Sequence, residues 1–276
     1  MLLEVDVIDY HIHTIFSCDS HLKPEMVCNR AIERDFYEIA FTEHLDLDPQ
    51  DDGYGYYNYD DITEKISELK SQYNGRLKIK KGVEITYQKE REDEIRRFLN
   101  DKDYDFIIGS VHLVNNFDVS HDEGTAEFFK QLDRERAFLS YFEVTFDLVN
   151  SGIFDCLGHF EMIRRYALKY IADYSYEEFK KPIDEILETI KKKRIALEVN
   201  TSGLRHLPKE TYPRMEIVRR FLNLGGKYLT IGSDAHLPEH IGYRIPETMK
   251  LLKNMGIEGI TLFNKGEKIS YKEKDV

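Results

Sequence analysis

The sequence predicts an α/β fold, either a (β/α) barrel or a doubly wound parallel sheet. Short apolar runs rich in β-branched residues alternate with amphipathic helical patterns seven or eight times along the 276 residues. The apolar runs are continuous, as is typical of parallel strands that are buried on both faces. No glycine-rich phosphate loop follows the first run, which argues against a dinucleotide-binding version of the doubly wound sheet.

The predicted strands are short and are separated by helical patterns or turn residues. Seven of them cover residues 4–10, 38–42, 77–83, 106–111, 154–158, 195–199 and 228–231, and residues 259–263 are an eighth candidate. Their alternation with helical patterns is what a repeated strand–helix unit requires.

Helices are predicted between these strands from their capping residues and apolar spacing. Pro24 suits a first helical turn, and this helix runs to about Arg34. The next helix begins at Asp60 or Asp61 and ends before Gly75. The remaining predicted helices cover residues 125–150, 176–193, 212–224 and 246–254.

Composition and charge narrow the class of function. A formal net charge of -12 argues against a general nucleic-acid binder, because affinity for a phosphate backbone depends on clustered Lys and Arg. No apolar run is long enough to span a membrane, and the N-terminus is acidic where a signal peptide would be basic. Cys18, Cys28 and Cys156 show no paired spacing, so no disulfide framework is expected. We therefore expect one domain over residues 1–276, in a reducing cytoplasm.

Side chains that can bind a metal ion follow nearly every predicted strand. Because the carboxyl ends of barrel strands open onto one face, these side chains are expected to converge there. His11 and His13 are two residues apart on extended backbone and therefore point the same way. Imidazole nitrogen with carboxylate oxygen suits Zn, Fe or Mn better than Ca or Mg. The six histidines and three carboxylates are His11, His13, Asp19, His44, Glu84, His112, His159, Asp234 and His236.

Each of these residues also has a structural interpretation when it is taken alone. A single histidine after a strand, such as His112 or His159, is more often only hydrogen-bonded, and Glu84 could pair with Lys80. Their coincidence favours a metal site, because random placement would scatter the histidines into helices. The polar, tyrosine-rich segment at residues 46–60 is either a loop over one end of the barrel or an ordinary surface loop.

Taken together, seven segments resemble the PHP (polymerase and histidinol phosphatase) superfamily, and within it the monofunctional histidinol-phosphate phosphatases. The resemblance covers nearly the full length, and the segments occur in the order of the superfamily signature. They are DYHIHTIFSCD (9–19), FTEHLD (41–46), GVEITY (82–87), IIGSVHLV (107–114), FDCLGHFEMIRRY (154–166), EVNTSGLR (198–205) and IGSDAH (231–236).

This resemblance implies a distorted (β/α)7 barrel that holds three divalent metal ions. A first ion would be held by His11, His13, Glu84 and Asp234, and Glu84 would bridge to a second ion held by His112 and His159. Asp19, His44 and His236 would hold the third. Some superfamily members have a histidine where Asp19 stands, and His21 is an alternative ligand.

The resemblance also implies the reaction, which is hydrolysis of L-histidinol phosphate by metal-activated hydroxide in histidine biosynthesis. Arg165 and Arg205 match positions of phosphate-binding arginines, and a guanidinium fork suits a phosphate dianion. The adjacent Arg164 could exchange roles with Arg165. Asp234 or a neighbouring histidine could move the proton of the leaving group, and His206 is one candidate.

Three other functions compete with this one. Another PHP phosphoesterase could act on a different small phosphate or a nucleotide. An amidohydrolase-like barrel could cleave C–N bonds, but such sites usually have a lysine as the metal bridge, where this chain has Glu84. A metal-stabilised scaffold without activity would be expected to have lost ligands, whereas all nine positions are filled here. The oligomeric state has no signal in the sequence.

Overall fold

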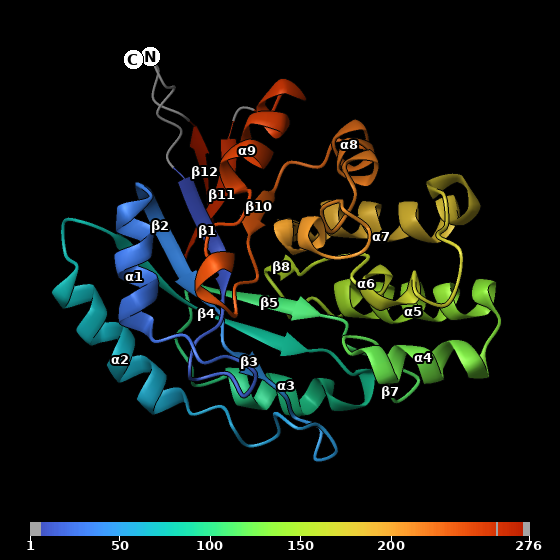
Figure 1. The fold of residues 1–276 in the computed structure, drawn as a ribbon, viewed down its shortest axis with the longest axis horizontal. Helices are drawn as coiled ribbons and strands as arrows, with labels where there is room; N and C mark the ends of the chain where they lie inside the picture. The colour runs from blue at the N-terminus through green and yellow to red at the C-terminus, as the bar shows by residue number, and fades with distance from the viewer. Residues whose placement is uncertain (1–6, 258, 273–276) are drawn as a thin grey trace.

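A nearly closed parallel sheet forms the centre of the computed structural model, which describes residues 7–257 and 259–272 (Figure 1). The last strand in the hydrogen-bonded order returns to the first, since the backbone N–H of His13 donates to the carbonyl of Ala235 at 3.0 Å. The strands, in that order, are β1 (Val7–Ile12), β2 (Phe36–Phe41), β4 (Lys78–Thr86), β5 (Phe106–Ser110), β8 (Cys156–Leu157), β9 (Ala196–Asn200) and β10 (Leu229–Gly232).

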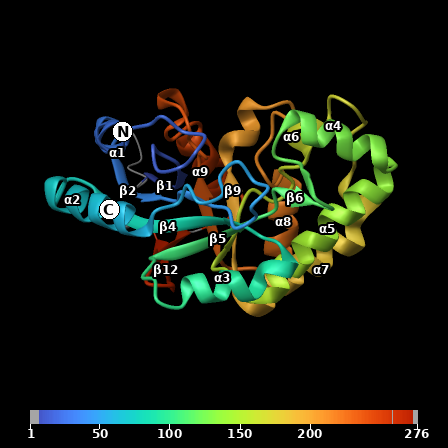
Figure 2. The ribbon, with the colours of Figure 1, turned by 90° about the horizontal axis from the view of Figure 1, so that it is seen from below.

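The helices cover the outside of this sheet, as the two views in Figures 1 and 2 show. The longer helices turn an apolar stripe inward; α7 (Lys180–Lys193), for example, buries Ile183, Ile186, Leu187 and Ile190 at helical spacing. The helices are α1 (Pro24–Glu33), α2 (Tyr59–Gln72), α3 (Glu92–Leu99), α4 (Asp122–Gln131), α5 (Arg134–Ser151), α6 (Arg164–Ala167), α7 (Lys180–Lys193), α8 (Met215–Asn223) and α9 (Ile245–Asn254).

Short elements extend the loops at the carboxyl ends of the strands. The strand β3 (His44–Leu45) pairs with the end of β4, and β6 (Leu113–Val114) pairs with β7 (Phe117–Asp118) as a small hairpin. The 3₁₀ turns are η1 (Lys89–Arg91), η2 (Tyr176–Phe179), η3 (Thr201–Arg205) and η4 (Pro238–His240).

Several predicted boundaries were wrong. The helix predicted over residues 125–150 is two helices, because Leu132 is extended and Asp133 caps α5 by accepting the N–H of Arg136 at 2.9 Å. The helix predicted from residue 212 begins at Met215, since the backbone of Tyr212 pairs with Asn200 instead. The short helix α3 was not predicted. The first strand continues through His11 to Ile12, and the predicted residues 4–6 lie outside the described residues.

The eighth strand candidate lies outside the barrel sheet. It forms β11 (Gly259–Asn264), which pairs antiparallel with β12 (Glu267–Lys272). Phe263 of this hairpin stacks on Phe106 at 4.9 Å between ring centroids, at the beginning of β5. The hairpin therefore covers the amino-terminal end of the strands, opposite the end at which the predicted metal ligands lie. Within residues 7–257 and 259–272, no helix is long and apolar enough to cross a membrane.

Candidate metal centre

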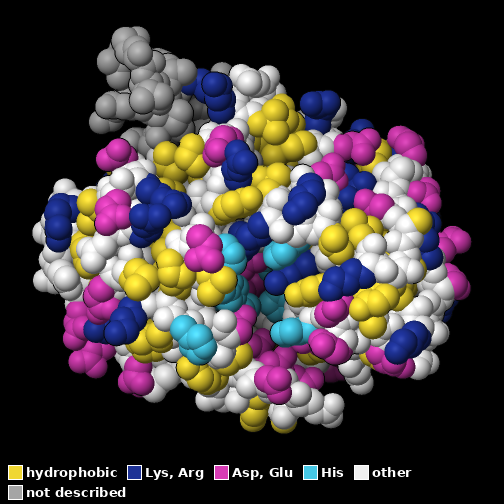
Figure 3. Space-filling model, viewed as in Figure 1, with side chains coloured by type: hydrophobic (Ala, Val, Ile, Leu, Met, Phe, Trp, Pro, Cys, Tyr) yellow, Lys and Arg dark blue, Asp and Glu magenta, His cyan; other side chains and the backbone are white. Residues whose placement is uncertain are grey.

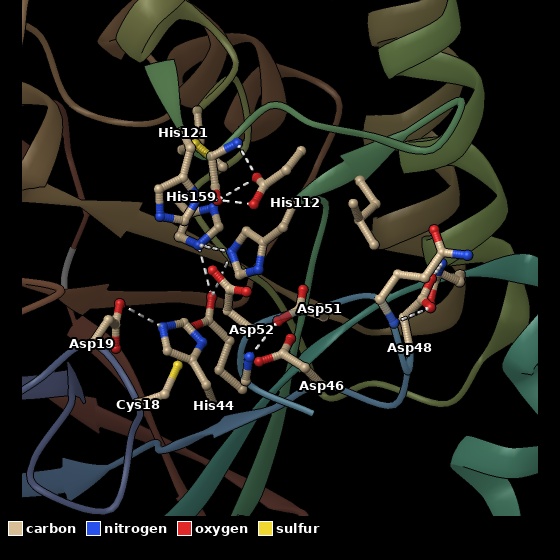
Figure 4. A pocket seen from close by; sticks show the side chains of 18 of the residues that line it. Cys18, Asp19, His44, Asp46, Asp48, Asp51, Asp52, His112, His121 and His159 are labelled. Atoms are coloured by element: carbon tan, nitrogen blue, oxygen red, sulfur yellow. Dashed lines mark hydrogen bonds and ion pairs between the residues drawn. The ribbon is translucent and has the colours of Figure 1, made fainter. Parts of the chain in front are cut away.

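A cavity of about 1490 Å³ opens at the carboxyl ends of the barrel strands. Figure 3 shows it as a hollow near the middle of one face, where histidine and acidic side chains gather beside basic ones. The residues that line it include seven of the nine predicted metal ligands and both predicted phosphate-binding arginines. The predicted segment at residues 46–60 lies over this end, because Asp46, Asp48, Asp51 and Asp52 line the cavity (Figure 4).

Glu84 is the centre of the site. It lies on β4, it is fully buried, and its two carboxylate oxygens face different histidines. Oε2 is 3.1–3.3 Å from one set of ring nitrogens and Oε1 is 2.7–3.5 Å from another. The first set belongs to His11, His13 and His44, and the second to His112 and His159.

Asp234 and Asp19 bring the remaining predicted ligands into the same cluster. Asp234 Oδ1 lies 3.6 Å from His13 Nε2 and 3.4 Å from His236 Nδ1. Asp19 Oδ2 lies 3.0 Å from His236 Nε2 and 3.5 Å from His44 Nε2. Figure 4 shows Asp19 pointing toward His44. All nine predicted ligands therefore lie together, whereas His21, the alternative to Asp19, is exposed.

The cluster contains three sets of donor atoms that lie within 4.8 Å of one another. They are His11, His13 and Asp234; His11, Glu84 and His159; and His13, His44 and His236. Nε2 of His11, Nε2 of His13 and Oε2 of Glu84 are buried and have no hydrogen-bond partner. Because buried polar atoms are nearly always satisfied, three such atoms that face one another fit a site for cations.

The charges within the cluster also suit a cation. Burial opposes ionisation of Glu84, but His11 and His44 hold the pKa of its carboxyl well below the usual range. Burial lowers the pKa of His13 well below its usual value, and the neighbouring His44 and His236 lower it further. Glu84 is therefore ionised and His13 neutral at neutral pH, which are the protonation states that metal ligands need.

Glu198 is a candidate site residue that the sequence did not reveal, although it lies in the segment EVNTSGLR. It is buried on β9, and its Oε1 lies 2.7 Å from His11 Nδ1. Its Oε2 accepts the backbone N–H of His159 at 2.6 Å. A carboxylate that binds the outer nitrogen of a metal-binding histidine fixes the orientation and tautomer of the ring. The contact with His11 therefore suggests this supporting role for Glu198, which the spacing of residues in the sequence could not reveal.

Two more histidines have partners on their outer nitrogens. His112 Nδ1 lies 2.8 Å from the hydroxyl of Thr86, the last residue of β4. His13 Nδ1 lies 3.2 Å from the hydroxyl of Ser17, which donates to the buried carboxylate of Glu43 at 2.7 Å. These contacts leave the Nε2 atoms of both rings directed at the centre of the cluster.

A basic group borders the metal cluster in the same cavity. It consists of Arg165, Arg205 and His206, whose Nε, Nε and Nδ1 atoms are buried without a hydrogen-bond partner. The guanidinium of Arg205 donates to the carbonyls of Ser233 and Asp234 at 2.7 and 2.5 Å, which holds it beside the segment of the predicted ligands Asp234 and His236. Burial, together with Arg165 and Arg205, lowers the pKa of His206 to about 3, so its imidazole is neutral.

Arg164 does not take the role of Arg165. Its side chain is only 2% exposed, and Nη2 lies 2.5 Å from Asp173 and 2.7 Å from Glu210. Adjacent residues of a helix point about 100° apart. The interpretation of Arg164 as a structural ion pair is therefore correct, and Arg165 is the one of the two that faces the cavity.

Comparison with known proteins agrees with this site. Residues 9–202 match the family model of the PHP domain. The chain is 30% identical to a histidinol-phosphatase of Lactococcus lactis over 270 residues, which is 98% of each chain. It is 28% identical to a histidinol-phosphatase of Bacillus subtilis, with 85% of this chain and 95% of that protein covered.

A solved structure shows the same similarity in the fold. It is the crystal structure of histidinol phosphate phosphatase from L. lactis, complexed with zinc, L-histidinol and phosphate. The TM-score is 0.87 at 28% identity, and the match covers 96% of this chain and 99% of that one. The predicted α/β barrel and the predicted family are confirmed: the chain belongs to the PHP domain family, and within it to the histidinol-phosphatases.

Proposed function

We propose that this protein is a metal-dependent phosphomonoesterase that hydrolyses L-histidinol phosphate to L-histidinol and phosphate in histidine biosynthesis. The observation that carries the proposal is one cavity in which seven of the nine predicted metal ligands lie beside two arginines. The relatives of nearly equal length support it, since their names give this activity and the L. lactis structure holds zinc, L-histidinol and phosphate.

Three divalent ions, zinc, iron or manganese, are proposed for the cluster. Their ligands would be His11, His13, Asp19, His44, Glu84, His112, His159, Asp234 and His236. The convergence of unpartnered buried nitrogens on Glu84 supports this assignment. When bound, such ions supply Lewis acidity for the phosphoryl oxygens and lower the pKa of bound water.

The residues of the chain bind and orient the phosphate. Arg165 and Arg205 present guanidinium groups that match the charge on the equatorial oxygens in phosphoryl transfer. The two carbonyl contacts of Arg205 hold its guanidinium beside the segment that carries Asp234 and His236. The Arg205 guanidinium is thus held in place before substrate binds, which reduces the reorganisation that the reaction requires.

His206 and Asp234 are proposed to hold the proton for the leaving alkoxide. Without a bound phosphate, burial and the two neighbouring arginines keep the pKa of His206 low, so its imidazole is neutral. A phosphate dianion between Arg165 and Arg205 would offset their charge and raise the pKa of His206 toward its ordinary value. The imidazole would then carry a proton close to the phosphate ester, which is where a general acid is needed.

A small zwitterionic substrate is favoured over a nucleic acid. The residues that line the cavity also include the carboxylates of Asp51, Asp52 and Asp118. They would repel a polyanion, whereas they attract the ammonium group of histidinol.

The free thiols of Cys18, Cys28 and Cys156 support the proposed location in a reducing cytoplasm.

A phosphate-release assay tests this function. Purified, metal-replete protein is expected to release phosphate from L-histidinol phosphate faster than from p-nitrophenyl phosphate or nucleoside monophosphates. Removal of metal with a chelator should abolish the release, and added zinc or manganese should restore it. If the metal-replete protein hydrolyses a nucleotide and leaves histidinol phosphate intact, the proposed substrate is wrong.

A further inference from the structure

A buried ionic network lies behind the basic group of the cavity. Its members come from three stretches of chain: the loop after β8, the segment before η2, and the segment before α8. They are two arginines and three carboxylates, Glu161, Arg164, Asp173, Glu210 and Arg214. None of these five residues is among those that line the cavity.

Glu161 holds the loop that leads from His159 to Arg165. It is fully buried and has a positive φ of 77°, a conformation that is uncommon outside glycine. Its carboxylate accepts the backbone N–H of Arg214 at 2.8 Å and the Nε of the same residue at 3.0 Å. The hydroxyl of Tyr174 donates to it at 2.5 Å. The hydrogen bonds that the Glu161 carboxylate accepts therefore hold the loop in this uncommon backbone conformation.

Arg164 connects this loop to the segment that carries Glu210. Its Nε donates to Asp173 Oδ1 at 3.0 Å, and its Nη2 donates to Glu210 Oε2 at 2.7 Å. Because Arg164 directly precedes Arg165, the pairing fixes the backbone from which the Arg165 guanidinium extends. A planar guanidinium held by two carboxylates has little rotational freedom.

Glu210 in turn fixes the loop that carries Arg205 and His206. The carbonyl of Glu210 is so close to Gly203 that a Cβ at that glycine would lie 2.1 Å from it. Two backbone hydrogen bonds between Asn200 and Tyr212, at 2.8 and 2.9 Å, close the loop at its base. The side chain of Glu210 thus joins this loop to the helix of Arg165.

We propose that Arg164 and Glu210 are positioning residues that set the distance between Arg165 and the loop of Arg205 and His206. The inference rests on the proposed function, because it assumes that Arg165 and Arg205 bind the substrate phosphate. Two groups on separate loops bind one phosphate well only if their separation is fixed before binding. The Arg164–Glu210 ion pair, at 2.7 Å, is a direct side-chain contact between the two loops.

Glu210→Ala is the variant that tests the proposal. The side chain of Glu210 is 47% exposed, and Arg164 keeps its contact with Asp173, so the fold should persist. The Michaelis constant for histidinol phosphate and the dissociation constant of inorganic phosphate should both rise about tenfold. The turnover number and the metal content should change less than twofold, because no metal ligand or reacting group is altered.

Asp184→Ala is the matched control. Asp184 also binds an arginine through two hydrogen bonds, to Arg220 at 2.8 and 2.7 Å, but it joins α7 to α8 away from the cavity. This variant should lose a similar amount of thermal stability and keep the wild-type constants for substrate and phosphate. Equal effects of Glu210→Ala and Asp184→Ala on these constants would overturn the proposal.

A double variant separates positioning from a general loss of stability. If Glu210 acts through Arg165, then adding Glu210→Ala to Arg165→Met should weaken phosphate binding less than twofold further. Additive effects would contradict the proposal. Isothermal titration with inorganic phosphate keeps the test independent of turnover. Wild-type protein that binds phosphate without hydrolysing histidinol phosphate would refute the proposed function, and absence of phosphate binding would refute the positioning proposal.

Discussion

Glu84 and His206 illustrate how burial and neighbouring charges give single residues their chemistry. Glu84 is fully buried, yet His11 and His44 keep its carboxylate ionised. His206 is kept neutral by burial beside two guanidinium groups. The same side chains in water would have ordinary pKa values, so the protonation state of each depends on which residues the fold places around it.

The variant Glu84→Gln should lose both bound metal and activity. The amide cannot supply two anionic oxygens to opposite sides of the cluster, so kcat/KM should fall by at least about 100-fold. Elemental analysis and phosphate release would measure the effect. The control is Glu38→Gln, which changes a buried carboxylate on β2 that hydrogen-bonds Tyr10 at the other end of the barrel. Full metal content in Glu84→Gln would contradict the central role of this residue.

The stability of metal-free protein should depend on pH through His206. Its folded pKa of about 3 is below the unfolded value of 6.5, so the unfolded chain binds more protons between these values. The stabilisation is therefore present above pH 6.5 and is lost as the pH falls toward 3. Between pH 7 and pH 5, wild type should lose about 2 kcal/mol more stability than His206→Gln, as measured by urea unfolding. Equal losses would contradict the low pKa.

At the scale of elements, the end of each barrel strand carries or shortly precedes a predicted metal ligand or a residue that contacts one. The strand β4 supplies Glu84 and then Thr86, which contacts the outer nitrogen of His112. The strand β9 supplies Glu198, which contacts His11 of β1 and the backbone of His159 after β8. The alternation of side chains along a strand makes this possible, since residues two apart face the same side.

Glu198→Gln should weaken metal binding while the nine ligands stay in place. Loss of the anionic partner lowers the basicity of His11 and loosens its ring, which typically costs 10- to 100-fold in metal affinity. Competition with a fluorescent zinc chelator would measure this change. Glu188→Gln on the outer helix α7 is the control and should retain wild-type affinity. An unchanged affinity in Glu198→Gln would show that the contact with His11 has no influence on the metals.

At the scale of the whole molecule, the two ends of the barrel differ in the residues that they carry. The carboxyl ends of the strands hold the ionic site, and the amino ends are covered by the β11–β12 hairpin. Phe263 of the hairpin is fully buried against Tyr10 and Phe106. That residues 1–276 act as one domain stays a prediction.

Phe263→Ala should destabilise the protein without changing catalysis. Removal of a fully buried phenylalanine typically costs 3–5 kcal/mol, and the cavity left would lie at the end opposite the metals. Urea unfolding should show the loss, and KM at a temperature where the variant is folded should equal that of wild type. Ile269→Ala in the same hairpin, where the side chain is 49% exposed, should cost much less. A raised KM in Phe263→Ala would link the two ends of the barrel.

The sequence by itself determined the class of fold and the nine candidate ligands. Parallel strands are recognisable as continuous apolar runs, and the ends of such strands meet at one face, so the position of a histidine after a strand predicts its location. It did not determine the break between α4 and α5, because Asp133 interrupts a pattern whose apolar spacing continues. Boundaries of this kind depend on local capping that periodicity does not resolve.

Only the tertiary structure decided which neighbours the ligands have. Arg164 and Arg165 are adjacent and chemically identical, and they separate into a buried ion pair and a cavity residue because a helix turns about 100° between them. Glu198 and His11 are 187 residues apart in the chain and meet only when the barrel closes. Contacts at such separation are set by packing of the whole sheet, so the chemistry of each ligand follows from the fold, while its identity can be recognised in the sequence.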